Sequence, residues 1–70
     1  MNRIQRNKLK LSKWTAVQPS NGEKHFIVTR LIEEDGQSDH VLIEAIHSKR
    51  ECCMLWTELK DDTVWQQGWR

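Results

Sequence analysis

Apolar and polar residues alternate along most of the chain, and three short stretches interrupt the alternation. Residues typical of turns fall at Asn21-Gly22, at Asp35-Gly36 and at Ser48 to Glu51, between stretches rich in β-branched and aromatic side chains. Asn-Gly tolerates the positive φ angles of a tight type I′ turn. The pattern predicts an all-β fold: a four-stranded, twisted antiparallel meander that a strong twist can curl into a half-open barrel.

This arrangement of turns makes both faces of the predicted sheet apolar. One face collects Val17, Phe26, Val28, Ile32, Val41, Ile43, Ala45, Met54 and Trp56, and the other Trp14, Ile27, Leu31, Leu42, Ile46, Cys53, Leu55 and Leu59. The predicted cross-strand pairs include Val17–Phe26, Phe26–Ala45, Val28–Ile43, Ala45–Met54 and Ile43–Trp56. Because one face of such a sheet is usually solvated and polar, we expect the second face to be covered. A strong twist, the C-terminal residues or a second copy of the protein could cover it.

The C-terminal stretch WTELKDDTVWQQGWR holds three of the four tryptophans. An aspartate at 61 or 62 is a typical helix N-cap and Gly68 a typical C-terminal stop, so a short helical turn is predicted over residues 63–67. On such a turn Trp65 and Trp69, four residues apart, would share one side. The rings would then close the under-covered sheet, and the alternative is an aromatic surface that binds a ligand.

Charge is unevenly distributed along the 70 residues, whose formal net charge is +1. Five cations precede the first acidic residue, which leaves six basic and ten acidic residues, a net charge of −4, for positions 14 to 70. Residues 1–8 are polar and basic apart from Ile4, so we predict a flexible basic tail there and a single small β domain over residues 9–70.

Cysteine usage and hydropathy indicate the compartment. Cys52 and Cys53 are adjacent, so they close no loop, and we expect Cys53 to be buried and Cys52 to be partly exposed. The sequence shows neither a long apolar span nor the apolar core of a signal peptide. We therefore expect a cytoplasmic protein that does not associate with membranes.

Several short sequence motifs resemble those of a known protein family. SKWTAV, EKHFIVT, WTELKD and a final W-x-x-G-W formed by Trp65, Gly68 and Trp69 resemble a family of small tryptophan-rich bacterial proteins of unknown function. The resemblance spans roughly positions 9 to 69. It implies a bacterial cytoplasmic protein and implies no activity, cofactor or mechanism.

Candidate chemistry in the sequence is sparse. The histidines and cysteines form neither a C-x-x-C nor an H-E-x-x-H spacing, so no metal site is predicted. No deep pocket, Gly-rich phosphate loop or oxyanion loop is evident, and we expect neither a cofactor nor enzymatic activity.

These observations favour a non-enzymatic small binding or accessory protein, acting through protein–protein interaction or self-association. Its candidate binding residues are Trp14, His25, Trp65 and Trp69. The alternative is a small protein that binds RNA or single-stranded DNA through exposed tryptophans and a basic N-terminal arm. The cations of that arm are Arg3, Arg6, Lys8, Lys10 and Lys13.

Overall fold

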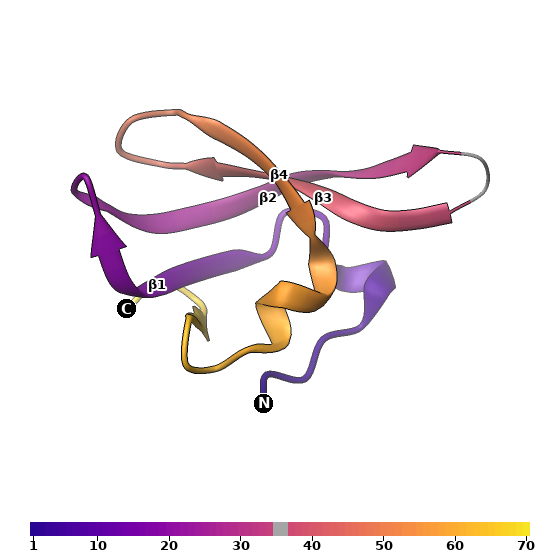
Figure 1. Cartoon of the computed structure of the whole chain (residues 1–70), viewed down its shortest axis with the longest axis horizontal. Coiled ribbons are helices and arrows are strands. Elements are labelled where there is room, and N and C mark those ends of the chain that lie inside the picture. Colours follow the sequence, from indigo (N-terminus) through magenta and orange to yellow (C-terminus); the bar gives the residue numbers. More distant parts are fainter. Residues whose placement is uncertain (35–36) are drawn as a thin grey trace.

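The computed structural model describes residues 1–34 and 37–70, and the side chains of residues 1–32 and 39–70. Its strands, which form one antiparallel open sheet, are β1 (Lys13–Ser20), β2 (Glu23–Glu34), β3 (Gln37–Ala45), β4 (Glu51–Leu55) and β5 (Trp65–Gln67). Two 3₁₀ turns, η1 (Arg6–Lys8) and η2 (Trp56–Lys60), flank it (Figure 1). The spatial order is β4-β3-β2-β1-β5. The predicted all-β meander is confirmed, and β5 extends it beyond β1.

The prediction of a helical turn over residues 63–67 is wrong, because that segment makes a tight turn and then a strand. Thr63 donates two hydrogen bonds to Asp61 Oδ1, from its backbone N at 3.0 Å and from its Oγ at 2.5 Å. The chain then pairs antiparallel with β1, with Trp65 opposite Ala16. The helical turn lies earlier, at η2, so Trp56 falls just beyond the strand on which it was predicted.

The first hairpin has the predicted turn and a different register. Asn21 and Gly22 have φ angles of 56° and 72°, which a type I′ turn requires. The pairing of β1 with β2 is interrupted between Thr15 and Ser20, so the predicted pair Val17–Phe26 is wrong. Trp14 lies opposite Phe26 instead. This irregularity brings Trp14 to the core face of the sheet.

The other two hairpins differ in how well the sequence predicts them. The pairs Phe26–Ala45 and Val28–Ile43 between β2 and β3 are confirmed, whereas the turn predicted at Asp35-Gly36 lies outside the described residues. The register predicted for β3 and β4 is wrong by four residues, because Cys52 and not Trp56 lies opposite Ile43. The connection spans residues 46–50 and includes Lys49 with a φ of 62°, and it reverses the chain earlier than predicted.

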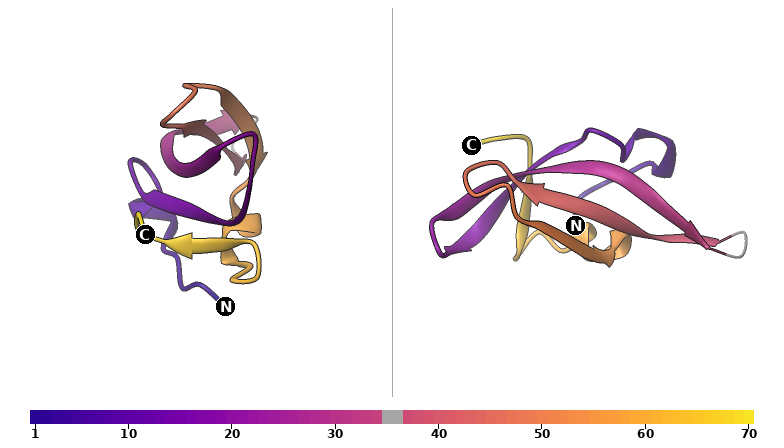
Figure 2. Two further views of the ribbon diagram at one scale, coloured as in Figure 1. Left: turned by 90° about the vertical axis from the view of Figure 1, so that its left-hand side faces the viewer. Right: turned by 90° about the horizontal axis from the view of Figure 1, so that it is seen from above.

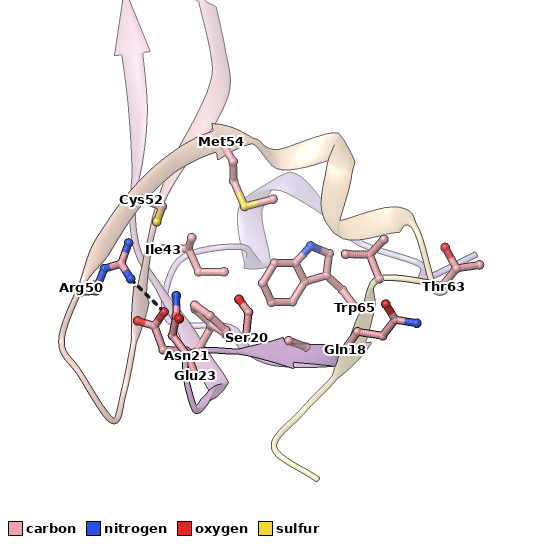
Figure 3. Close-up of a pocket in the computed structure, with 13 residues that line it drawn as sticks. Gln18, Ser20, Asn21, Glu23, Ile43, Arg50, Cys52, Met54, Thr63 and Trp65 are labelled. Carbon is pink, nitrogen blue, oxygen red and sulfur yellow. Dashed lines mark hydrogen bonds and ion pairs between the residues drawn. The ribbon is translucent and has the colours of Figure 1, made fainter.

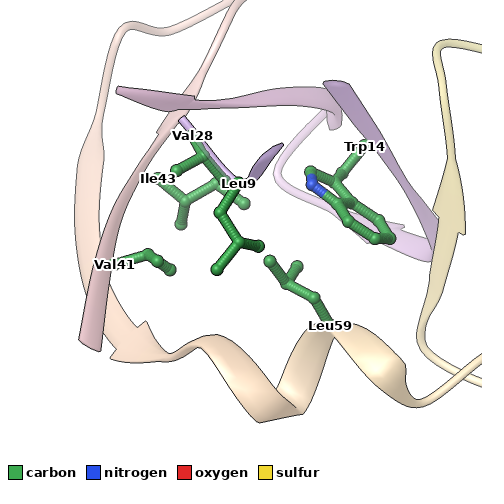
Figure 4. Close-up of a cluster of buried hydrophobic side chains, with 6 residues drawn as sticks. All are labelled: Leu9, Trp14, Val28, Val41, Ile43 and Leu59. Atoms are coloured by element: carbon green, nitrogen blue, oxygen red, sulfur yellow. The ribbon is translucent and has the colours of Figure 1, made fainter. Parts of the chain in front are cut away.

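The core lies between the concave face of the twisted sheet and η2. Its buried side chains are those of Leu9, Trp14, Val28, Val41, Ile43 and Leu59 (Figure 4). Trp14 is 2% exposed, and its Nε1 donates to Ser12 Oγ at 2.8 Å, so the ring is buried without an unsatisfied donor. Leu59 was predicted on the opposite face, but η2 carries it into the core.

Residues 1–8, predicted to be flexible, lie beneath the sheet on the same side as η2 (Figures 1 and 2). Asn2 Nδ2 donates to Leu59 O at 2.9 Å and to Trp65 O at 2.8 Å, and Asn2 N donates to Lys60 O at 2.9 Å. Ile4 packs against the core. Their mobility in solution stays a prediction.

The outer face of the sheet is covered in part by the last three residues. Arg70 N donates to Thr15 Oγ1 at 2.9 Å, and this hydroxyl donates to Gly68 O at 2.7 Å. Trp65 packs toward the core, whereas Trp69 lies on the outer face, so the prediction that they share one side is wrong. Leu55 is 41% exposed farther along this face. No helix in the described part of the chain is long and apolar enough to cross a membrane.

Candidate functional site

A pocket of about 450 Å³ opens on the concave side of the sheet, between β4 and the pair of strands β1 and β5 (Figure 3). Its apolar walls are formed by Phe26, Ile43, Met54, Val64 and Trp65. Its polar lining includes the side chains of Gln18, Ser20, Asn21 and Thr63. Apolar walls with a few polar groups are typical of ligand-binding sites in proteins, and this volume lies in their usual range.

Trp65 forms one wall of the pocket and is held in place by its own strand. The turn at Asp61 directs the chain into β5, where Trp65 pairs with Ala16. Its ring meets Phe26 edge to face, with the centroids 5.1 Å apart and an interplanar angle of 88°. In Figure 3 Trp65, Met54 and Ile43 border the same space. The half-buried ring therefore offers a face to an occupant of the pocket.

Glu23 and Arg50 form an ion pair at one end of the pocket. Arg50 Nη1 lies 3.2 Å from Glu23 Oε1, and Ser48 Oγ donates to Glu23 Oε2. The side chain of Glu23 is 10% exposed, so its charge depends on these two partners for stabilisation. Because the two charges neutralise each other, this end of the pocket attracts neither a cation nor an anion strongly.

Open strand edges border the pocket on two sides. Among the described strands, β4 is the last of the sheet and pairs only with β3. One of its outward N–H groups, that of Leu55, donates to Glu58 Oε2 at 3.2 Å. On β1, backbone pairing with the C-terminal segment ends at Val17, whose N donates to Val64 O at 2.9 Å, so residues 18–20 lie beyond β5. Pro19 on this edge has no N–H to donate, so an added extended segment could hydrogen-bond mainly to the edge of β4.

The cysteines lie on opposite faces of β4, and both are exposed, so the expectation that Cys53 is buried is wrong. Cys52 lines the pocket, and Ile43 lies opposite it in β3. Among the described side chains, those of residues 1–32 and 39–70, no three from His, Cys, Asp or Glu lie close enough together to hold a metal ion. What the pocket offers chemically is apolar contact and hydrogen bonding.

The structure separates the aromatic residues that the sequence singled out. Trp14 is part of the core, and Trp65 lines the pocket. On the outer face, the rings of His25 and Trp69 lie 6.0 Å apart, and the ammonium of Lys13 lies 4.8 Å from the centroid of Trp69. His25 Nε2 is 2.9 Å from Arg70 O. Lys13, His25 and Trp69 thus form a surface cluster distinct from the pocket.

The five cations of the predicted basic arm do not all lie around one cavity. Arg3, Lys8 and Lys13 line a second cavity, of about 420 Å³, while Arg6 and Lys10 do not. The residues that sequence reasoning missed are Glu23, Arg50, Met54 and Val64 in the first pocket. Glu23 and Arg50 are 27 positions apart, so no local pattern in the sequence indicates that they pair.

The fold and the pocket define a small all-β protein built on a five-stranded antiparallel open sheet. The chain belongs to the family described as "Tryptophan-rich protein (DUF2389)", whose model matches residues 12–70. This match confirms the resemblance inferred from the tryptophan-containing words. Neither the curated proteins nor the solved structures include one with significant similarity to the chain.

Proposed function

We propose that this protein is a non-enzymatic binding module, located in the cytoplasm, whose pocket holds an extended, uncharged apolar segment of a partner protein. The observation that supports this proposal is the position of the pocket, whose apolar walls lie between two open strand edges. Strand edges supply backbone hydrogen bonds to an added segment, and pockets beside them select its alternate side chains.

Charge and shape favour this class of ligand. Glu23 and Arg50 already form an ion pair with each other, so a charged segment would gain little binding energy from either. Trp65 and Met54 supply a flat aromatic face and an adaptable thioether, which suit a bulky apolar side chain. Gln18 and Asn21 supply amide groups that can hydrogen-bond to the backbone of the segment.

Affinity capture of partners from a bacterial lysate, with and without nuclease, tests the proposal. The bait is the wild-type chain, and the pocket variant is Val64→Arg, because Val64 is 47% exposed and lines the pocket. The matched control is Leu11→Arg, because Leu11 is 62% exposed and does not line it. We expect a protein partner that survives nuclease, is lost with Val64→Arg and is retained with Leu11→Arg.

The same bait gives a structural readout. A synthetic peptide from the captured partner should shift the indole N–H resonance of Trp65 in a two-dimensional NMR spectrum and leave that of Trp69 in place. A partner that binds both arginine variants equally well would refute the pocket as the binding site. A partner lost on nuclease treatment would favour the second candidate function.

The second candidate is a protein that binds RNA or single-stranded DNA. It is favoured by the cluster on the outer face, where Lys13 lies over the half-exposed ring of Trp69 beside His25. An exposed ring next to a cation is the arrangement on which unpaired bases stack. Replacing Trp69 with Ala would then weaken oligonucleotide binding in a folded protein.

A further inference from the structure

The second cavity, of about 420 Å³, lies between the N-terminal segment and β1, separate from the proposed protein-binding pocket. Three cationic residues line it, Arg3, Lys8 and Lys13. Gln5, Ser12 and Gln67 contribute polar groups, and none of the acidic residues whose side chains the structure describes lines the cavity. Ile4 and the buried Trp14 complete its apolar wall.

None of the three cations has an acidic partner in the described part of the chain. The ion pairs there join the N-terminal amine to Asp62 and Arg50 to Glu23. Three like charges around one concavity raise its positive potential, most strongly at low salt because all three residues are exposed to water. An anion that enters would therefore be attracted by all three.

The structure holds the backbone that carries these cations in place. Gln67 Nε2 donates to Arg3 O at 2.7 Å, and the neighbouring Asn2 is tied to η2 and β5 through its side chain. Lys8 N donates to Gln5 O at 2.9 Å, which closes the turn η1. Because the backbone is already positioned, a bound anion has to order only the side chains, which lowers the entropic cost of binding.

We propose that this cavity binds the phosphate group of a nucleotide, either free or within a single-stranded nucleic acid. An arginine beside two lysines suits phosphate, because the guanidinium can donate two parallel hydrogen bonds to its oxygens. The cavity is larger than a lone phosphate needs, and its volume lies in the usual range for small-ligand sites. Lys13 also lies beside the exposed ring of Trp69, with its ammonium 4.8 Å from the ring centroid, and a base that displaces this ammonium can stack on the ring.

Titration with three probes at low salt, followed by fluorescence and NMR, tests this proposal. The probes are inorganic phosphate, a fluorescent analogue of ADP and a labelled single-stranded oligothymidylate. The variants Arg3→Gln and Lys8→Gln each remove one cation that lines the cavity, and both side chains are exposed, so the fold should be retained. Arg6→Gln and Lys10→Gln remove the same charge from exposed positions nearby that do not line it.

We expect Arg3→Gln and Lys8→Gln to weaken binding roughly tenfold each, as the loss of a charge-assisted hydrogen bond implies. Each should also reduce the slope of log affinity against log salt by about one in the oligonucleotide titration. Arg6→Gln and Lys10→Gln should change affinity less than about twofold, because exposed charges at a distance are screened. Thermal melting by circular dichroism checks that all four variants fold.

Each outcome decides the proposal. Binding of the ADP analogue or of the oligonucleotide with this variant pattern supports the site, and comparison of the two shows whether a free nucleotide or a nucleic acid supplies the phosphate. Equal losses in all four variants would show non-specific attraction to a basic surface and would refute the site. Failure of every probe to bind at low salt would also refute it. Neither result bears on the protein-binding pocket, which Val64→Arg tests separately.

Discussion

Trp14 has the largest of the fully buried side chains. Apolar packing and a hydrogen bond both hold it in place. The ring packs within the core, while its Nε1 donates to Ser12 Oγ, which in turn donates to Leu9 O at 2.6 Å. In a chain of 70 residues one ring of this size is a large share of the buried apolar surface. Its removal should therefore destabilise the whole fold.

We predict that Trp14→Ala lowers the free energy of unfolding by about 3–5 kcal/mol, because it leaves a cavity in the core. Trp69→Ala is the matched control: that ring is 44% exposed, and its main loss is the hydrogen bond to Phe26 O, worth about 1 kcal/mol. Urea denaturation measures both. If Trp69→Ala proved the more damaging of the two, the assignment of Trp14 to the core would be refuted.

Among the elements, β5 depends most on a local turn. Asp61 accepts hydrogen bonds from the hydroxyl and the backbone N–H of Thr63, and its backbone O accepts from Val64 N and Trp65 N at 3.1 and 2.9 Å. These bonds turn the chain from η2 toward β1. The position of Trp65 in the pocket wall follows from this turn.

This turn predicts a pH dependence. The hydrogen bond from the Thr63 hydroxyl, followed by the one from the Thr63 backbone, lowers the pKa of Asp61 below its ordinary value of 3.8. A pKa lowered in the folded state contributes stability above 3.8, and this contribution is lost as the pH falls through the lowered pKa. We therefore expect the turn to weaken only in strong acid.

Thr63→Ala removes the larger of the two causes, so the pKa of Asp61 should rise toward its ordinary value. A carboxyl-detected NMR titration of Asp61 measures the change. Thr57→Ala, at an exposed threonine of η2, is the control and should leave the midpoint in place. An unchanged midpoint in Thr63→Ala would show that the hydroxyl does not bond to Asp61 in solution.

In the molecule as a whole, the N-terminal segment links η2, β5 and the core. Asn2 makes three hydrogen bonds to the backbone of residues 59–65, and Ile4 packs against the core cluster. The sequence predicts a flexible tail for residues 1–8, whereas these contacts hold the segment beneath the sheet. The two descriptions differ in what deletion of the segment should do.

We predict that deletion of residues 1–8 lowers the free energy of unfolding by about 2 kcal/mol or more, because it removes several hydrogen bonds and the burial of Ile4. The amide of Asn2, bonded to Lys60 O, should exchange with solvent more slowly than that of Arg3. Denaturation and hydrogen exchange measure these effects. Unchanged stability with rapid exchange of the Asn2 amide would confirm the flexible tail instead.

Local patterns in the sequence determined the class of fold, the first turn and the central pairing. Alternation of apolar residues indicates strands, Asn21-Gly22 favours one backbone conformation, and the pairs Phe26–Ala45 and Val28–Ile43 follow from the alignment of apolar positions on neighbouring strands. Each of these features depends on residues that are close in the chain or on a periodicity of two. The short tryptophan-containing words likewise indicated the family.

The tertiary structure decided the features that depend on irregular backbone and distant contacts. The interruption in β1 brings Trp14 to the core, and the third connection reverses the chain earlier than predicted, so that Met54 lies opposite Val41. Alternation places residues on a face only while the register is regular, so one bulge or an earlier turn changes the result. Both candidate sites join segments from opposite ends of the chain, as Gln67 does when it holds Arg3, and only the closed fold brings such groups together.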